Sequence, residues 1–356
     1  MTSSRIFSPY RLCPLGAHID HQGGPVLGCA FNIGTTLIYE ALDTNEICIT
    51  SEEFGEARFV IGDLDLRHWS RYAQGAARAL RIRRGMKARV SGPLIGAGLS
   101  SSASVGLAYL KALADVNGIK LSREDLVRLD YELEHEQLGL QNGLLDQMSI
   151  VYGKKKTLLL MDTRVVAVSL LPDPPDHEFA WIVAYSGISR ELATSGYNVR
   201  VTECHEAASS LQEGAKVLSD VPRDVFEARK STLPDNLRKR AEHFFSEVER
   251  VQRGAAAWNA ARLDVFGQLM NQSCQSSITN YESGNPVLNE LHALASDTPG
   301  VYGSRFNGGG YGGCVVALAK AERAQDAGEE IAERFSALHP ELASKVFMAE
   351  AVDGLE

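Results

Sequence analysis

Glycine and serine are concentrated in residues 90–110, VSGPLIGAGLSSSASVGLAYL, where a strand-like run passes into an apolar helix-like run. Glycine allows a tight turn and a close approach to a ligand, and the serine hydroxyls lie beside the free N–H groups of a helix that starts near Ala103. The long apolar helix argues against a surface linker, and the missing Lys-Ser/Thr pair excludes a Walker P-loop. The segment therefore predicts an anion-binding turn made of Gly96, Ala97, Gly98, Leu99, Ser100, Ser101, Ser102 and Ala103.

Two further segments combine polar side chains with glycine turns. Residues 9–24 read PYRLCPLGAHIDHQGG, with Arg11 and His21 among their polar side chains, and residues 303–314 read GSRFNGGGYGGC and continue into VVALA. In this order the three segments resemble the motifs of the GHMP kinase superfamily, most of all its galactokinase branch, which includes the galacturonokinases. The resemblance implies a two-domain α+β GHMP kinase fold with the active site in the cleft between the domains.

The glycine-rich segment near residue 310 has a second interpretation, which we reject. Gly308, Gly310 and Gly313 satisfy the Gly-x-Gly-x-x-Gly pattern, but a strand-like run follows where a dinucleotide site needs a helix. We expect a tight glycine turn between two strands. The resemblance implies that this turn packs against the anion-binding turn at residues 96–103, which we call the phosphate loop. Asn307 stands where the family more often has Thr, so the chain lacks the usual hydroxyl there.

Phosphoryl transfer needs a group near the attacking hydroxyl, a cation and a metal on the phosphates. Residues 142–147, NGLLDQ, resemble the galactokinase segment with the catalytic aspartate, which implies Asp146 as the base. Arg11 matches the arginine of the first motif and implies a cation at the γ-phosphate. Glu134 and Ser102 match the oxygen ligands of Mg²⁺, and oxygen suits a hard cation. Without the resemblance, Asp146 would be a helix cap, Arg11 a surface salt bridge and Glu134 a surface residue.

The resemblance also implies residues around the sugar and the ATP base. Trp69 and Tyr72, in HWSRYAQG, resemble the aromatic segment near the adenine pocket. Taken alone, His18 would be as compatible with a structural histidine as with a ligand, and the aromatic residues would be core. The substrate-binding positions implied are Ala17, His18, Asp20, Gly143, Asp146 and Tyr197.

Substrate choice depends on Ala17, where galactokinases place a Glu that accepts a hydrogen bond from the C6 hydroxyl. A C6 carboxylate would be repelled by such a Glu, so Ala17 fits a uronate. Arg190, Arg164 or a pair of backbone amides would then bind the carboxylate. We expect phosphorylation of the anomeric hydroxyl of D-galacturonate with ATP and Mg²⁺. The alternatives are a kinase for galactose or another neutral sugar, and a non-catalytic sensor of sugar and ATP.

Composition agrees with an ordinary globular enzyme. The 356 residues, 44% of them hydrophobic, can bury two cores. A net charge of −9 without a long basic run argues against nucleic acid or an anionic membrane as partner, which leaves the sugar or uronate and ATP. Six cysteines without a Cys-x-x-Cys pair predict reduced, mostly buried thiols and a cytoplasmic protein. We expect neither a signal peptide nor a membrane span.

Periodicity predicts the elements that carry these residues. A capping box between Ser122 and Asp125 opens a helix that we expect to reach Gln137. Strands are expected at residues 26–39, 47–51, 88–92, 157–162 and 179–185, and further helices at 197–218 and 321–338. The proline-rich run LPDPP at residues 171–175 suits neither helix nor strand. It divides the chain into an N-terminal domain with the phosphate loop, sugar motif and Asp146, residues 1–172, and a C-terminal domain with the glycine-rich third motif, residues 173–356.

Overall fold

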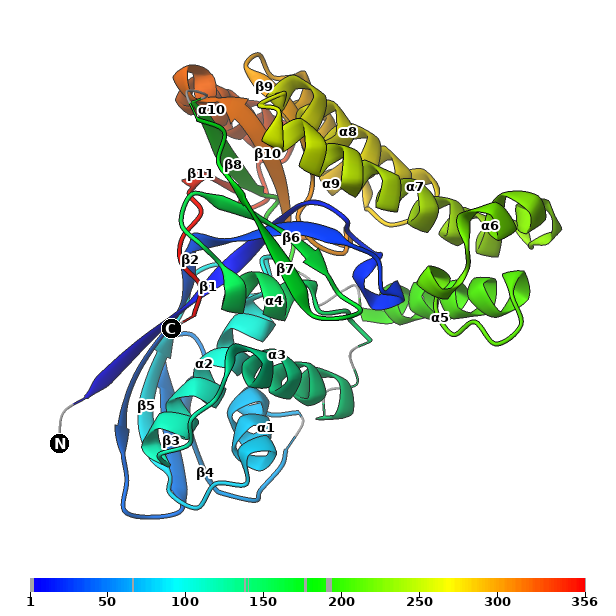
Figure 1. Cartoon of the computed structure of the whole chain (residues 1–356). Coiled ribbons are helices and arrows are strands. Elements are labelled where there is room, and N and C mark those ends of the chain that lie inside the picture. The colour runs from blue at the N-terminus through cyan, green and yellow to red at the C-terminus, as the bar shows by residue number, and fades with distance from the viewer. Residues whose placement is uncertain are drawn as a thin grey trace.

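A computed structural model describes residues 3–65, 67–137, 139, 141–175, 178–189 and 194–355 (Figure 1). The first half of the chain forms β1 (Ser4–Leu15), β2 (Val26–Ala41), β3 (Glu46–Ser51), β4 (Gly55–Val60), α1 (Arg71–Leu80), β5 (Met86–Ser91), α2 (Ser101–Val116), α3 (Arg123–Glu132), α4 (Leu145–Tyr152), β6 (Thr157–Asp162) and β7 (Ala167–Pro172). The second half forms β8 (Phe179–Tyr185), α5 (Thr194–Leu211), α6 (Arg223–Arg229), α7 (Asp235–Asn259), α8 (Leu263–Thr279), α9 (Pro286–Asp297), β9 (Val301–Phe306), β10 (Cys314–Lys320), α10 (Ala321–Leu338) and β11 (Lys345–Ala349).

The first seven strands form one sheet in the order β4-β3-β5-β2-β6-β7, with β1 paired to β2. All its pairings are antiparallel except that of β3 with β5. The 16-residue β2 holds the sheet together, since it pairs with β6 near Val26 and with β5 near Tyr39. Helix α2 packs on β1 and β2 and is apolar nearly all round, as a helix buried between a sheet and other helices must be. The phosphate loop is thereby attached to a rigid element.

The last four strands form a second, antiparallel sheet in the order β11-β8-β10-β9. Helices α9 and α10 cover it and share a small apolar cluster with it. Helices α7 and α8 instead contribute Trp258 and Phe266 to the main cluster, which also contains Leu15 and Leu27 of the first sheet. Figure 1 shows α5 and α6 extending away from both sheets. One continuous core therefore joins the two halves of the chain.

The segment after β11 returns to the first sheet. The Val352 N–H donates to Ala30 O at 3.0 Å, and the Gly354 N–H donates to Gly153 O at 2.8 Å. The Leu355 N–H donates to Ile150 O at 2.9 Å, near the end of α4. These bonds attach α4, which carries Asp146, to residues from the far end of the chain.

The five predicted strands are present, and α10 covers the helix predicted at residues 321–338. The capping box of Ser122 and Asp125 is also confirmed. The six thiols are free, and all but that of Cys48 are buried, as expected. None of the described helices has the length and apolar composition needed to span a membrane.

The helical run after Ser122 reaches Gln137 as predicted, but its last five residues, Leu133–Gln137, form a π-helical turn. Two other predicted boundaries are wrong. Helix α5 ends at Leu211 because the chain turns at Gly214, whose φ is 81°. Residues 171–172 belong to β7, since the missing N–H of a proline is tolerated on an edge strand.

Candidate active site

A cavity of about 1030 Å³ opens where β1, the loop before α2, the start of α4 and the start of α5 meet. Its walls include segments from both halves of the chain, so neither half contains the cavity alone. The structure brings eleven of the predicted site residues to this cavity: Arg11, Ala17, His18, Asp20, Trp69, Gly96, Ser101, Ser102, Glu134, Asp146 and Tyr197.

The backbone alternates in conformation from residue 94 to residue 100, a stretch that leads into and overlaps the phosphate loop. Leu94, Gly96, Gly98 and Ser100 have φ values of 56°, 76°, 73° and 62°, and the residues between them are not in this left-handed region. Such alternation gathers successive N–H groups into a concavity that binds anions. Helix α2 begins directly afterwards, so its positive end adds to the effect. Five of the residues predicted to bind phosphate are buried, namely Ala97, Gly98, Leu99, Ser100 and Ala103.

The glycine turn between β9 and β10 packs directly against the phosphate loop. A Cβ at Gly313 would lie 2.4 Å from Ala97 O, and one at Gly308 would lie 3.0 Å from Gly98 O. The close approach therefore needs glycine, above all at Gly313, where φ is 93°. Strand β10 follows the turn. This confirms both the packing that the resemblance implied and the rejection of a dinucleotide-binding helix.

Arg11 on β1 reaches Asp146 in the first turn of α4. Its Nε donates to Oδ1 of Asp146 at 2.7 Å, and the Arg11 side chain is only 2% exposed. Its Nη1 donates to the backbone oxygens of Gly98 at 3.2 Å and Asn307 at 2.6 Å. Burial lowers the pKa of Arg11, but the charge and hydrogen bond of Asp146 and the charges of Cys13 and Asp20 together outweigh it, and the pKa is raised. Arg11 is therefore a permanent cation that holds the Asp146 carboxylate in one orientation.

Glu134 lies in the π-helical turn and is fully buried beside the cavity. Its Oε2 accepts hydrogen bonds from Asn142 Nδ2 at 2.5 Å and Gln147 Nε2 at 2.8 Å. The Ser102 hydroxyl lies beside the carboxylate, and Oε1 is buried without a hydrogen-bond partner in the described part of the chain. Burial and the charge of Asp146 raise the pKa of Glu134 to about 7.

This oxygen set fits a hard divalent cation. Mg²⁺ typically takes one or two protein oxygens and completes its octahedron with phosphate oxygens and water. A cation would also compensate the otherwise costly buried carboxylate of Glu134. No group of three or more His, Cys, Asp and Glu side chains that could hold a metal occurs among the described residues.

Asp20 is brought close to the start of α4. Its Oδ2 accepts a hydrogen bond from the Leu145 N–H at 3.3 Å. A Cβ at Gly143 would lie 2.4 Å from the same oxygen, which explains why a glycine stands there. Burial, and next the charge of Asp146, raises the pKa of Asp20 to about 6. The carboxylates of Asp20 and Asp146 thus border the same end of the cavity.

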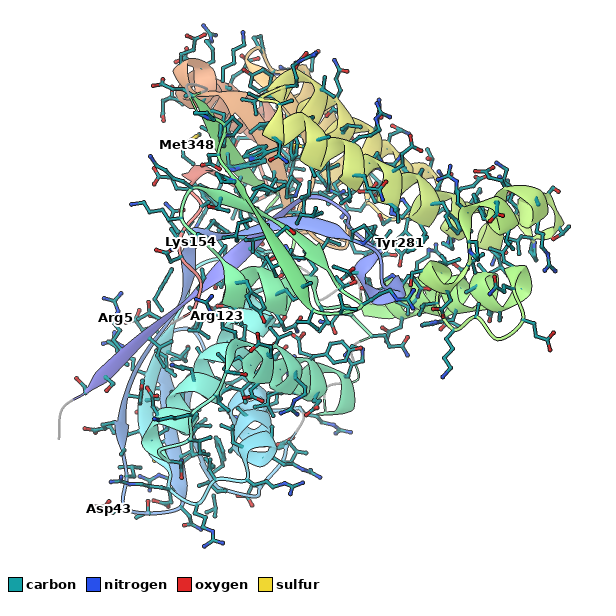
Figure 2. The ribbon with its side chains drawn as sticks, in the orientation of Figure 1. Arg5, Asp43, Arg123, Lys154, Tyr281 and Met348 are labelled. Atoms are coloured by element: carbon teal, nitrogen blue, oxygen red, sulfur yellow. The ribbon has the colours of Figure 1, made fainter. Side chains whose placement is uncertain are left out.

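An aromatic cluster supports this end of the cavity. The His18 ring stacks on Tyr281 with centroids 4.1 Å apart, and Ser283 Oγ lies 3.4 Å from its Nε2. The His21 Nε2 lies 3.0 Å from the Tyr281 hydroxyl, and burial lowers the pKa of His21 to about 3, so this ring is neutral. Tyr197 meets His21 edge-on at 6.0 Å. Figure 2 labels Tyr281, where the loop after β1 approaches α5.

Aromatic residues also line the opposite part of the cavity. Trp69 and Phe54 stack with centroids 5.8 Å apart, and Tyr72 lines the cavity nearby. Phe54, on the turn between β3 and β4, could not be predicted as a site residue, because a single aromatic residue in a hairpin turn gives no local signal. Other lining residues were not predicted either, among them Asn142, Asn198 and Tyr311. Asn142 and Asn198 could have been found from the sequence, because they adjoin the predicted site residues Gly143 and Tyr197.

Arg164 and Arg190 are the two side chains expected as alternative partners of a C6 carboxylate. Arg164 is 49% exposed and is engaged at the surface by Asp220 at 3.0 Å and by Ser219 O at 3.0 Å. It is not among the described residues that line the cavity, so its proposed role is not supported. Arg190 lies outside the described residues. Ala17 itself lines the cavity and is 4% exposed.

Comparison with known proteins assigns the chain to a family. The GHMP kinases N terminal domain matches residues 71–154, and the GHMP kinases C terminal domain matches residues 256–337. A galacturonokinase from Arabidopsis thaliana is 37% identical, over 96% of this chain and 89% of that protein. A galactokinase from Roseiflexus sp. (strain RS-1) is 32% identical, over 98% and 91%.

The solved structures agree with these matches. The structure of Lactococcus lactis galactokinase complexed with galactose matches with a TM-score of 0.93 at 27% identity, over 99% of this chain and 95% of that chain. A mevalonate kinase at 16% identity, with a TM-score of 0.70, shares the fold. The chain therefore belongs to the GHMP kinase family, in the branch of sugar kinases that includes galactokinase and galacturonokinase.

Proposed function

We propose that this protein transfers the γ-phosphoryl group of ATP to the anomeric hydroxyl of D-galacturonate, in the presence of Mg²⁺. The observation that carries the proposal is the buried Arg11–Asp146 pair, which lies at a cavity bordered by an anion-binding loop. Membership in the family supports the reaction class. The 37% identity to a galacturonokinase supports the uronate.

In the proposed step, the C1 oxygen forms a bond to the γ-phosphorus and the bond from that phosphorus to the β,γ-bridging oxygen breaks. The proton of the C1 hydroxyl passes to Asp146, and ADP leaves with the electron pair of the broken bond. Arg11 holds the Asp146 carboxylate and offsets the negative charge near it. Because such transition states are largely dissociative, orientation of the hydroxyl contributes strongly.

The remaining residues are assigned to binding. We assign the phosphates to residues 96–103 and the base to Trp69. Glu134 and Ser102 would hold Mg²⁺, which supplies charge neutralisation on the phosphates. We further propose two domains, residues 1–172 and 173–356, that meet after β7. The residues assigned to the sugar are Ala17, His18, Asp20, Gly143, Asp146 and Tyr197.

The uronate assignment depends on the absence of a negative charge at position 17, where this chain has Ala17. Asp20, Glu134 and Asp146 already place carboxylates along the cavity. A further acid at position 17 would repel a sugar carboxylate, whereas alanine adds no charge. Galactose is the second candidate, because galactokinases align over nearly the whole chain at 32% identity.

A substrate panel tests the proposal. Purified protein with ATP and Mg²⁺ is given D-galacturonate, D-glucuronate, D-galactose or no sugar, and ADP release is followed. We expect turnover with galacturonate, and a sugar 1-phosphate as the product by ³¹P NMR. Preference for galactose would keep the kinase and remove the argument from Ala17. ATP binding without turnover on any sugar would replace the kinase with a non-catalytic sensor.

A further inference from the structure

Asn307 follows β9, and each of its polar groups has a partner. The residue is fully buried. Its backbone N–H donates to Cys314 O at 2.9 Å, which closes the glycine turn. The side-chain Oδ1 accepts from the Cys13 N–H at 2.9 Å. The side-chain Nδ2 donates to Arg11 O at 3.1 Å and to Gly98 O at 3.3 Å.

Asn307 therefore contacts Arg11 at both ends of that residue. The Asn307 carboxamide bonds the Arg11 backbone oxygen, and the Asn307 backbone oxygen accepts from Arg11 Nη1 at 2.6 Å. Gly98 O receives both Arg11 Nη1 and Asn307 Nδ2, so the same bonds orient the phosphate loop. With Nη1 held in this way, Arg11 Nε faces Asp146.

We propose that Asn307 is a positioning residue that sets the Arg11 guanidinium against Asp146 and against the phosphate loop. The inference rests on the proposed function, since it assigns Arg11 a part in the phosphoryl transfer. An amide combines one acceptor with two N–H donors, and these bonds use all three. The threonine that is more usual in the family offers one hydrogen to donate. Aspartate has the same shape but, when ionised, no donor.

The first test uses Asn307→Asp, Asn307→Thr and Asn307→Ala. Because misplacement by about 1 Å can cost ~100-fold, we expect kcat to fall by roughly 10- to 100-fold in Asn307→Asp, with much smaller changes in both KM values. Aspartate preserves the volume, so this variant also covers the case in which Asn307→Ala fails to fold. Normal kcat in folded Asn307→Asp would overturn the inference.

The control for packing is Asn271→Ala on α8. The Asn271 Oδ1 accepts from the Ser304 N–H at 2.8 Å and from Ser296 Oγ at 3.0 Å, and Asn271 does not belong to the described lining of the cavity. We expect Asn271→Ala to lower Tm while kcat stays normal. If kcat fell together with Tm to the same extent in Asn307→Asp and in Asn271→Ala, Asn307 would have only a structural role.

A double-mutant cycle tests whether Asn307 acts through Arg11 or contributes to turnover independently of it. If Asn307 acts through Arg11, Asn307→Asp should cost little further turnover once Arg11→Ala has been made. Losses that simply multiply would contradict the inference.

A readout without turnover separates this inference from the proposed function. We expect the Arg11 Nε–H to give a slowly exchanging signal in ¹⁵N NMR, because it is buried in a charge-assisted bond. Asn307→Asp should accelerate its exchange, whereas Asn271→Ala should not. Unchanged exchange would overturn the inference even for an inactive protein. Faster exchange in a protein that phosphorylates no sugar would retain the positioning role and remove the proposed function alone.

Discussion

Arg11 Nε and Asp146 Oδ1 lie 2.7 Å apart, although 135 residues separate them in the sequence. Arg84 and Asp43 form a pair of the same length, but their side chains are 45% and 82% exposed. An exposed pair contributes little, whereas removal of one member of a buried pair leaves an uncompensated charge. Equal distances thus conceal very different energies.

Asp146→Asn keeps the size of the side chain and removes the carboxylate. We expect turnover to fall by about 10²- to 10⁴-fold, as for loss of a general base. ATP affinity, measured by calorimetry, should change little because the phosphate loop is untouched. Asp43→Asn is the matched control and should leave turnover normal. Normal turnover in Asp146→Asn would remove this residue from the proposed mechanism.

Ala17→Glu restores an acid at the position that we assign to the C6 group. Two carboxylates in contact repel, so kcat/KM for galacturonate should fall by about tenfold or more. Ala17→Gln has nearly the same size without the charge, and it should retain more galacturonate activity. If both variants lose activity equally, the effect is steric and the charge argument fails.

Asp20→Asn should raise stability at neutral pH while it weakens sugar binding. Burial and the charge of Asp146 raise the pKa of Asp20 to about 6, above its ordinary value of 3.8. Between these values the folded state binds more protons than the unfolded state, so the free energy of unfolding falls as pH rises.

Asparagine cannot ionise, so the free energy of unfolding of Asp20→Asn should exceed that of the wild type by about 1–3 kcal/mol at pH 8. The gain should shrink toward pH 4.5, and urea denaturation at both pH values measures it. A variant that is less stable than the wild type at pH 8 would contradict the assigned direction of the pKa shift.

Glu134→Gln should raise the Mg²⁺ concentration needed for half-maximal turnover, because it removes the buried anionic oxygen beside Ser102. Titration of Mg²⁺ at fixed ATP measures the effect. Glu132→Gln is the control, since Glu132 is 40% exposed and pairs with Arg128 at 2.9 Å. Similar Mg²⁺ curves for wild type and Glu134→Gln would exclude Glu134 as a ligand, while chelation by EDTA should stop turnover in both.

Local sequence predicted what depends on local geometry. The glycines near residues 96 and 310 carry their own conformational preference, and β10 follows its turn as the apolar run VVALA indicates. The capping box of Ser122 was likewise readable, because its two partners are three residues apart.

Features that depend on distant partners could not be predicted in the same way. Arg164 looked available as a sugar ligand, but it pairs with Asp220, which lies 56 residues away. Asn307 is a second example. The sequence shows an asparagine where the family more often has threonine, but its hydrogen bonds to Arg11 and Gly98 appear only in three dimensions. The π-helical turn at Glu134 also departs from the apolar period on which the helix prediction depended.

The bond between Arg11 Nη1 and Asn307 O spans 296 residues, and this sets when the site can form during synthesis. At about 5–20 residues per second, roughly 15–60 s pass between the emergence of the two residues from the ribosome. Arg11 and Asp146 are both synthesised well before Asn307. A nascent chain therefore carries Arg11 and Asp146 before it has the turn that orients Arg11, and the candidate site is complete only after Asn307 has been synthesised.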